Sequence, residues 1–331
     1  MVRGSHASYV DQCFIKYRKR KINKMSLLEK EWFIQAPWGR ICIVAWGDCL
    51  DPPVLVCHGN IDSAASFRPL ISLLPKKFYY VGMELPGNGK SDPFPPGVLF
   101  SSHDFLYSIV VVVRHFRWEK FIYLAHSFGS SLGKMYTMAY PNKLSKIIEL
   151  DPITVNGVMD HQNYSIWYQR SYHEYCKNYD KYNLPKEFGP KYKKEEAIAK
   201  LVKNRQLTKE TAEATLDRWS EPTGDGHIRF TFDQRLKIFV HYQISEKLAK
   251  ELYTNIQIPT LAFVTDVSID RGLYKTTPFF LDEKSYPAGN YRVRFVSGYH
   301  DVHVVKPEIL APYITNFLLY GLQGLDNTSK L

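Results

Sequence analysis

Residues 121–129 decide the fold: they read Phe-Ile-Tyr-Leu-Ala-His-Ser-Phe-Gly. The apolar and aromatic residues that open this stretch are typical of a buried strand, and a helix-like run from Ser131 to Tyr140 follows the polar turn. An opening antiparallel pair is predicted at Trp32–Ile34 and Gly39–Trp46. Other short apolar runs, separated by helix-length segments, lie at 54–57, 79–83, 146–150, 260–264 and 291–296. This alternation predicts an α/β fold with a mostly parallel, twisted sheet and helices on both of its faces.

The regular succession of short, strand-like apolar runs stops between Asp151 and Pro259. The sequence there is rich in tyrosine and then has helix-like periodicity. We therefore predict a helical cap at residues 155–255. It is inserted into a sheet domain that is formed by residues 25–154 and 256–322.

Composition excludes several classes of protein. The 331 residues are 45% hydrophobic, 15% aromatic and 23% charged, which is enough apolar material for a large core and too much for a wholly disordered chain. No apolar run approaches the roughly 18 residues that a membrane-spanning helix needs. The 5 cysteines show no paired spacing, so neither a disulfide framework nor a zinc knuckle is predicted.

The formal net charge of +10 is concentrated at the beginning of the chain, where residues 1–24 carry seven Lys or Arg and one Asp. We predict a basic, disordered leader there, with a targeting role as an alternative, and no nucleic-acid binding by the folded part. Residues 323–331 are predicted to form a flexible tail that ends in Ser329-Lys330-Leu331. A terminal Ser-Lys-Leu is read by a peroxisomal import receptor, so the predicted location is the peroxisome, with the cytoplasm as the alternative.

Ser127 is the candidate nucleophile. The segment Ala125-His-Ser-Phe-Gly129 is close to the G-x-S-x-G elbow, in which a serine sits on a strained turn between a strand and a helix. Small residues two positions to either side leave room for that turn, and the following helix N-terminus favours developing negative charge. An earlier predicted strand ends at His58-Gly59-Asn60, so the backbone N–H groups of Asn60 and Phe128 are the candidate oxyanion donors.

A nucleophilic serine needs a histidine to remove its proton. In the chain order Ser, acid, His, this histidine follows the last strand, where the sequence offers His300 and His303. His300, in a loop of small residues, is favoured, and His303 is expected to be buried against that loop. A metal site built on His300-x-x-His303, with Asp301 beside it, lacks a further ligand in an obvious place, so no metal or other cofactor is predicted.

The acid that orients the histidine is not settled by the sequence. Asp151 follows the strand predicted at 146–150 directly and is ranked first. Asp270 and then Asp266, both beyond the strand predicted at 260–264, are the alternatives.

These residues resemble the α/β-hydrolase family and, within it, the serine hydrolase-like proteins associated with peroxisomes. The resemblance covers about Trp32 to Leu319. It rests on Pro37-Trp-Gly39, His58-Gly-Asn60 with Ser63-Ala-Ala-Ser-Phe67, Tyr79-Tyr-Val81, Gly87-Asn-Gly-Lys-Ser91, Ala125–Gly129 and Gly298–His303, and in the cap on Leu216-Asp-Arg218, Gly226 and Asp233-Gln-Arg235. The resemblance implies an α/β-hydrolase fold and a serine hydrolase mechanism with an unassigned substrate. Ser127 stands where the similar haloalkane dehalogenases and epoxide hydrolases use aspartate, which argues against both activities.

The sequence thus predicts a serine hydrolase (a serine esterase or thioesterase) that cleaves an ester, thioester or related acyl bond. Its catalytic triad would be Ser127, His300 and Asp151, and the aromatic residues of the cap suggest a small apolar acyl substrate. The alternative is a catalytically inactive protein of the same fold that binds a ligand or a partner. The oligomeric state and the identity of the substrate are not disclosed by the sequence.

Overall fold

An eight-stranded sheet forms the centre of the molecule, in the order β1-β2-β4-β3-β5-β6-β11-β12. β1 pairs antiparallel with β2, and β2 pairs antiparallel with β4, while all other neighbours are parallel. The strands are β1 (Lys30–Ala36), β2 (Gly39–Trp46), β3 (Pro53–Cys57), β4 (Tyr79–Met83), β5 (Phe121–His126), β6 (Leu144–Leu150), β11 (Thr260–Thr265) and β12 (Tyr291–Val296). Each of them coincides with an apolar run of the sequence, so the predicted mostly parallel sheet is confirmed.

This structure is a computed structural model. It describes residues 28–326 except 155, 159–162, 239 and 241. The predictions for residues 1–24 and for Ser329, Lys330 and Leu331 lie outside the described residues.

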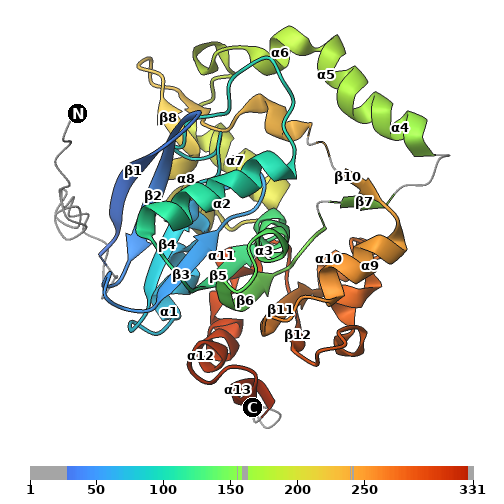
Figure 1. The fold of residues 1–331 in the computed structure, drawn as a ribbon. Coiled ribbons are helices and arrows are strands. Elements are labelled where there is room, and N and C mark those ends of the chain that lie inside the picture. Colours follow the sequence, from blue (N-terminus) through green and yellow to red (C-terminus); the bar gives the residue numbers. More distant parts are fainter. Residues whose placement is uncertain (1–27, 155, 159–162, 239, 241, 327–331) are drawn as a thin grey trace, which may run out of the picture.

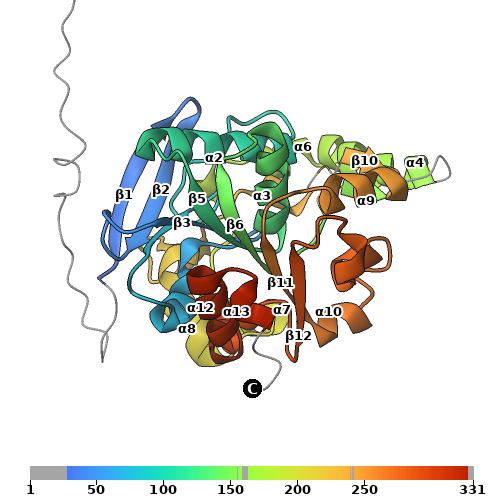
Figure 2. The same ribbon diagram turned by 60° about the horizontal axis from the view of Figure 1, so that its bottom comes forward.

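Helices cover both faces of the sheet (Figures 1 and 2). α2 and α3 lie on one face, and α1 and α12 lie on the other, as the two separate core clusters show. Helices connected to the sheet strands are α1 (Arg68–Leu73), α2 (Ser102–Phe116), α3 (Phe128–Ala139), α10 (Asp266–Asp270), α11 (Val302–Val305), α12 (Ala311–Tyr320) and α13 (Gln323–Asp326).

The side chains of β5 explain why helices are needed on both faces. Tyr123 and Ala125 belong to the core cluster beneath α2 and α3, whereas Ile122 and Leu124 belong to the cluster beneath α1 and α12. Every residue of β5 is buried. Burying a large apolar side chain stabilises a fold by about 1.5–3 kcal/mol, so a strand that is apolar on both sides is stable only between two layers.

The described residues between β6 and β11 are called the cap segment here. In Figure 1 its helices α4 to α6 project to the upper right of the sheet. Its elements are β7 (Asn156–Val158), α4 (Tyr164–Tyr168), α5 (Glu174–Lys177), α6 (Tyr179–Asn183), α7 (Lys194–Arg205), α8 (Lys209–Trp219), β8 (Ser220–Pro222), β9 (Ile228–Phe230), β10 (Tyr242–Ile244) and α9 (Glu246–Thr254). The short pairs β7–β10 and β8–β9 were not predicted, because three residues are too few to show a period of two.

Two buried arginines attach the cap segment to the sheet domain. Arg218 of α8 forms an ion pair with Glu84, which follows β4, at 2.6 Å. Arg235 donates hydrogen bonds to the carbonyl oxygens of Phe94, Pro95 and Val98. Guanidinium groups suit this role because they remain charged and have five N–H donors.

A second buried ion pair joins α3 to β6. The Nζ of Lys134 lies 3.2 Å from a carboxylate oxygen of Glu149, and both residues are buried. Aromatic rings surround the ammonium group, with the ring of Phe280 centred 4.7 Å away. Burial lowers the pKa of Lys134 and raises that of Glu149, while the opposite charge of each partner limits these shifts.

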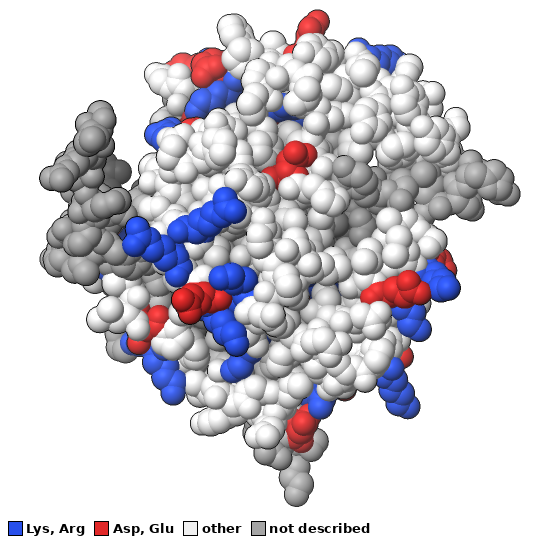
Figure 3. Space-filling model, in the orientation of Figure 1, with Lys and Arg blue, Asp and Glu red and all other residues white. Residues whose placement is uncertain are grey.

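Charged side chains of both signs are scattered over the face shown in Figure 3, and much of that face carries neither. Within the part of the chain that the structure describes, every helix is too short or too polar to cross a lipid bilayer.

Candidate active site

Ser127 occupies a strained turn between β5 and α3. Its backbone has φ 51° and ψ −118°, an uncommon conformation for a residue with a side chain, which costs on the order of 1–3 kcal/mol. The Ser127 N–H donates to the carbonyl of Leu150 at 3.0 Å, and the Ser130 N–H donates to the Ser127 carbonyl at 3.1 Å. These bonds from neighbouring elements hold the turn.

Two glycines allow other backbone segments to approach this turn. A Cβ on Gly129 would lie 2.6 Å from the carbonyl oxygen of Cys57 and 2.7 Å from that of His58, which is closer than atoms can pack. A Cβ on Gly59 would lie 3.2 Å from the Cβ of Ser127. The loop after β3 therefore passes directly beside the serine.

His300 lies between Ser127 and Asp151. Its Nε2 is 2.8 Å from the Oγ of Ser127, and its Nδ1 is 2.5 Å from Oδ2 of Asp151. Ser127 comes from the end of β5, Asp151 directly follows β6, and His300 follows β12, so three strand ends meet here. This is the placement expected for a site at the carboxyl edge of a parallel sheet.

Asp151 is fully buried and accepts hydrogen bonds from several donors besides His300. The N–H of Thr265 donates to Oδ1 at 2.9 Å and the hydroxyl of Tyr274 donates to Oδ1 at 2.9 Å, while the hydroxyl of Ser268 donates to Oδ2 at 2.5 Å. The backbone of Asp151 has a positive φ of 45°. These donors compensate the carboxylate for the water it has lost and fix its orientation.

The surroundings change the basicity of His300. Burial alone would lower its pKa, but the hydrogen bond to Asp151 and the charges of Asp151 and Asp301 raise the pKa above its ordinary value, against an opposing effect of Arg205. The imidazole is therefore a better proton acceptor than a free histidine.

The two alternative acids lie elsewhere. Asp266 is exposed at the start of α10 and accepts a hydrogen bond from the N–H of Gly298 at 2.9 Å. Asp270, at the end of the same helix, is also exposed. Asp151 is thus the carboxylate that the structure brings to His300, while Asp266 supports the loop that leads to it.

The predicted oxyanion donors belong to the two segments that flank the serine. Phe128 is the first residue of α3, and Asn60 follows the Gly59 that approaches Ser127, with its side-chain amide donating to the carbonyl of Leu236 at 3.1 Å. His58 is buried and structural: its Nδ1 donates to the Gly59 carbonyl at 2.7 Å, and its Nε2 accepts from the N–H of Leu85 at 3.0 Å.

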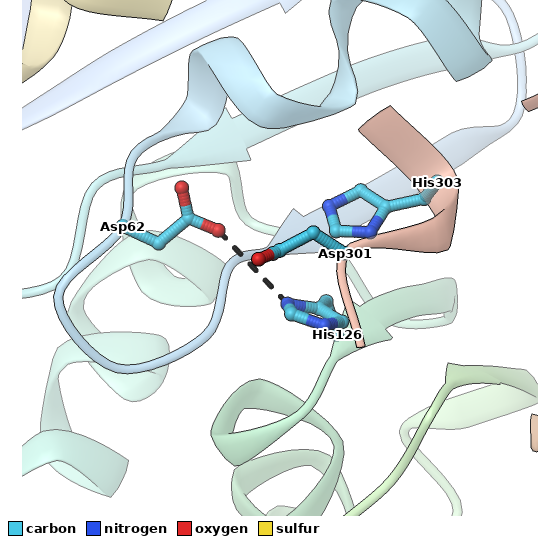
Figure 4. A group of neighbouring side chains, drawn as sticks. All are labelled: Asp62, His126, Asp301 and His303. Carbon is cyan, nitrogen blue, oxygen red and sulfur yellow. Dashed lines mark ion pairs between the residues drawn. The ribbon is translucent and has the colours of Figure 1, made fainter. Parts of the chain in front are cut away.

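A buried polar group behind His300 was not predicted from the sequence. Asp62, His126, Asp301 and His303 bring potential metal-ligand atoms within 4.8 Å of one another (Figure 4). Asp62 and His126 reach His303 from distant segments, so further potential ligands lie near it that were not obvious from the sequence. His303 is buried as expected, but among these side chains.

This group already contains a cation. Arg205 pairs with both carboxylates, through Nη2 to Oδ2 of Asp62 at 3.2 Å and through Nε to Oδ2 of Asp301 at 3.0 Å. A second hydrogen bond joins Nη2 of Arg205 to Oδ1 of Asp301. A metal ion here would have to displace this guanidinium group, so the residues do not form a ready metal site.

A mostly parallel sheet with a serine at a strand-to-helix turn, bonded to a histidine from beyond the last strand, defines the α/β-hydrolase class. The family model described as alpha/beta hydrolase fold matches residues 52–225, and the chain belongs to this family of hydrolases. Serine hydrolase-like protein 2 of Homo sapiens is 30% identical over 300 residues, which cover 88% of this chain and 94% of that protein.

Solved structures show the same fold. A hypothetical protein from Pseudomonas aeruginosa PAO1 aligns with a TM-score of 0.73 and 20% identity, covering 87% of this chain and 99% of its own. A thioesterase domain from the curacin biosynthetic pathway aligns with a TM-score of 0.68 and 19% identity, covering 86% of this chain and 98% of its own.

Proposed function

We propose that this protein is a serine hydrolase that cleaves an ester or thioester through an acyl-enzyme. The observation that carries the proposal is the continuous hydrogen-bonded series from the Ser127 hydroxyl through both nitrogens of His300 to Asp151, with distances of 2.8 Å and 2.5 Å. Family membership supports hydrolysis, and this geometry supports a nucleophilic serine.

In the proposed reaction, Ser127 Oγ attacks the carbonyl carbon while its proton moves to Nε2 of His300. Asp151 accepts the Nδ1–H of His300, which holds the tautomer with a free Nε2 and stabilises the imidazolium. The imidazolium then gives its proton to the leaving alcohol or thiol, and the acyl group remains on Ser127. Water attacks the acyl-enzyme with His300 as base, which releases the acid and restores the serine.

The tetrahedral oxyanion would be held by the backbone N–H groups of Asn60 and Phe128. The N–H of Ser127 itself is used in its bond to Leu150, so it is not the donor. Support for Asn60 comes from the close approach of Gly59 to Ser127, and support for Phe128 comes from its place at the N-terminus of α3. Loss of one such donor typically costs about 2.7–4 kcal/mol of transition-state stabilisation.

An apolar acyl group is the proposed substrate class. Phe128, next to the serine, packs against Phe105 with ring centroids 5.5 Å apart. The cap segment adds exposed aromatic side chains at Tyr164, Tyr168 and Tyr172. Turnover of p-nitrophenyl esters of increasing chain length tests this class, and we expect kcat/KM to rise from the acetate to longer acyl chains.

A fluorophosphonate probe tests the nucleophile directly, because it reacts with activated serines. Wild-type protein should be labelled, Ser127→Ala should not, and Ser145→Ala, which changes an exposed serine of β6, should be labelled like the wild type. Labelling that survives in Ser127→Ala, or no labelling and no ester turnover in the wild type, would overturn the proposal. The latter result would favour the inactive, ligand-binding alternative.

A further inference from the structure

Arg205 extends from the cap segment into the loops that carry the proposed active site. It is the last residue of α7, and only 16% of its side chain is exposed. Its Nη1 donates to the carbonyl oxygen of Ile61 at 3.1 Å, in addition to its ion pairs with Asp62 and Asp301. Its guanidinium carbon Cζ lies over the ring of Trp219, 4.4 Å from the ring centre, which fixes the side chain from a further side.

Both loops that Arg205 joins carry proposed site atoms. Ile61 and Asp62 directly follow Asn60, a proposed oxyanion donor, and Ile61 has a positive φ of 50°. Asp301 directly follows His300. The loop with Asn60, Ile61 and Asp62 is called the oxyanion loop here, and the loop with His300 and Asp301 is called the histidine loop. One guanidinium group therefore joins these two loops, which lie far apart in the sequence. The planar guanidinium group can donate hydrogen bonds to several acceptors in fixed directions at once.

His126 adds further contacts between the same two loops. Its Nε2 donates to the backbone carbonyl of His300 at 2.9 Å, and its ring lies between those of His300 and His303, with centroids 4.6 Å and 4.3 Å away. Figure 4 shows the ring pointing towards Asp62. His126 immediately precedes Ser127, so the position of the nucleophile and that of the histidine loop are linked through this side chain.

Arg205 supplies the positive charge that compensates the buried carboxylates of Asp62 and Asp301. Burial holds the pKa of His126 and His303 well below the ordinary value, so both imidazoles are neutral at pH 7. Asp301 has a pKa well below its usual range because, although burial opposes it, Arg205 stabilises the carboxylate. Without the guanidinium, two buried carboxylates would lack a permanent positive partner, which is costly in the protein interior.

We propose that Arg205 is a positioning residue that ties the cap segment to the oxyanion and histidine loops, so that full activity requires α7 to be seated against them. The inference rests on the proposed serine hydrolase function. Movement of α7 away from the sheet would release Asp62 and Asp301 together. The cap segment thus controls the alignment of the reacting groups.

Kinetics of full-length variants with p-nitrophenyl acetate test this role. Arg205→Met should lower kcat about 100-fold with little change in KM, because a displacement of about 1 Å in a catalytic geometry can cost that much. Arg205→Lys keeps the charge but cannot bridge the three acceptors, so its loss should be intermediate. Lys203→Met, an equal change of charge at an exposed position of the same helix, should behave as the wild type.

Two further readouts separate positioning from a general loss of structure. Added guanidinium ion should restore part of the activity of Arg205→Ala. The acid limb of kcat/KM against pH should move to higher pH in Arg205→Met, because Arg205 lowers the pKa of His300 and its removal leaves the negative charge of Asp301 unopposed. The groups that face His300 are Asp151, Asp301, Arg205 and His126.

The outcomes distinguish the two proposals. An active, probe-labelled wild type together with an Arg205→Met variant of unchanged kcat and unchanged pH profile would overturn the role of Arg205 alone. A loss of activity with neither guanidinium rescue nor a moved acid limb would also overturn it, because the residue would then be merely structural. A wild type without labelling or turnover would overturn the serine hydrolase proposal and, with it, this inference.

Discussion

Replacing Asp151 with asparagine should remove most of the proposed activity while leaving the fold intact. The carboxylate accepts at both oxygens, from His300 and the Ser268 hydroxyl on Oδ2 and from the Thr265 N–H and the Tyr274 hydroxyl on Oδ1. An amide has one acceptor oxygen, so its NH2 group must face either His300 or those two donors. Facing Thr265 would place two N–H groups against each other, so the NH2 group should face Nδ1 of His300.

That orientation selects the wrong histidine tautomer. An amide donor at Nδ1 makes this nitrogen an acceptor and puts the ring proton on Nε2, which then cannot take the proton of Ser127. In a known triad enzyme the corresponding change lowers kcat by about 10⁴-fold. That factor corresponds to about 5.4 kcal/mol of activation free energy, and we expect a loss of this order.

The assay is steady-state turnover of p-nitrophenyl acetate, with thermal unfolding to confirm that each variant is folded. Asp270→Asn is the matched control, because this exposed aspartate of α10 was an alternative acid in the sequence, and it should retain activity within about twofold of the wild type. A folded Asp151→Asn variant with wild-type kcat, or a large loss in Asp270→Asn instead, would refute the reasoning.

Three further predictions rest on contacts in the structure, and a fourth rests on the sequence of residues 329–331. The acid limb of kcat/KM should lie above pH ~6.5, the ordinary histidine pKa, because the pKa of His300 is raised and only its neutral form accepts a proton; a limb below that value would contradict the assignment. Gly129→Ala should lower stability by about 1–3 kcal/mol, since the added carbon would lie 2.6 Å from a carbonyl oxygen, and an unchanged melting temperature would argue against this packing. Lys134→Met should cost about 3–5 kcal/mol in urea unfolding because it leaves Glu149 buried without its partner, and adding Glu149→Gln should recover part of the loss; no recovery would mean that the pair is not coupled. Deleting residues 329–331 should move a fluorescently tagged chain from peroxisomes to the cytosol, and an unchanged location would disprove the predicted address.

The sequence predicts the sheet well because its strands are buried on both faces and are therefore continuously apolar. Residues 109–113 are a harder case, since they are all β-branched and favour a strand by propensity alone. They lie in α2, where a crossover between parallel strands requires a helix. Topology thus outweighs local preference here, because the strands on either side of this segment are clear.

The acid partner of His300 could only be ranked from the sequence. Asp151, Asp266 and Asp270 all lie just beyond predicted strands, and local patterns do not say which carboxylate turns inward. The structure shows what decides this: Asp151 has a positive φ and receives donors from Thr265. Those contacts join β6 to β11 across more than a hundred intervening residues, and a local pattern cannot reveal them.

Arg205 could not be identified from the sequence for a similar reason. It ends a helix with many charged residues, Lys194–Arg205, whose polar positions are typical of a solvated face. Its partners Asp62 and Asp301 are polar residues of loops, which sequence patterns assign to the surface. The signal for such a residue is the folded contact itself, because three separate segments must come together before the guanidinium has all of its acceptors.

The ion pair between Lys134 and Glu149 also limits the ways in which the chain can pack incorrectly. Sliding α3 along the sheet by one helical turn would move Lys134 by about 5.4 Å, which exceeds its present 3.2 Å separation from Glu149. Both charges would then be isolated in an apolar interior. α3 begins beside Ser127, and Glu149 lies two residues before Asp151. Packing errors that separate Lys134 from Glu149 would therefore also separate Ser127 from Asp151, and the buried ion pair makes such errors costly.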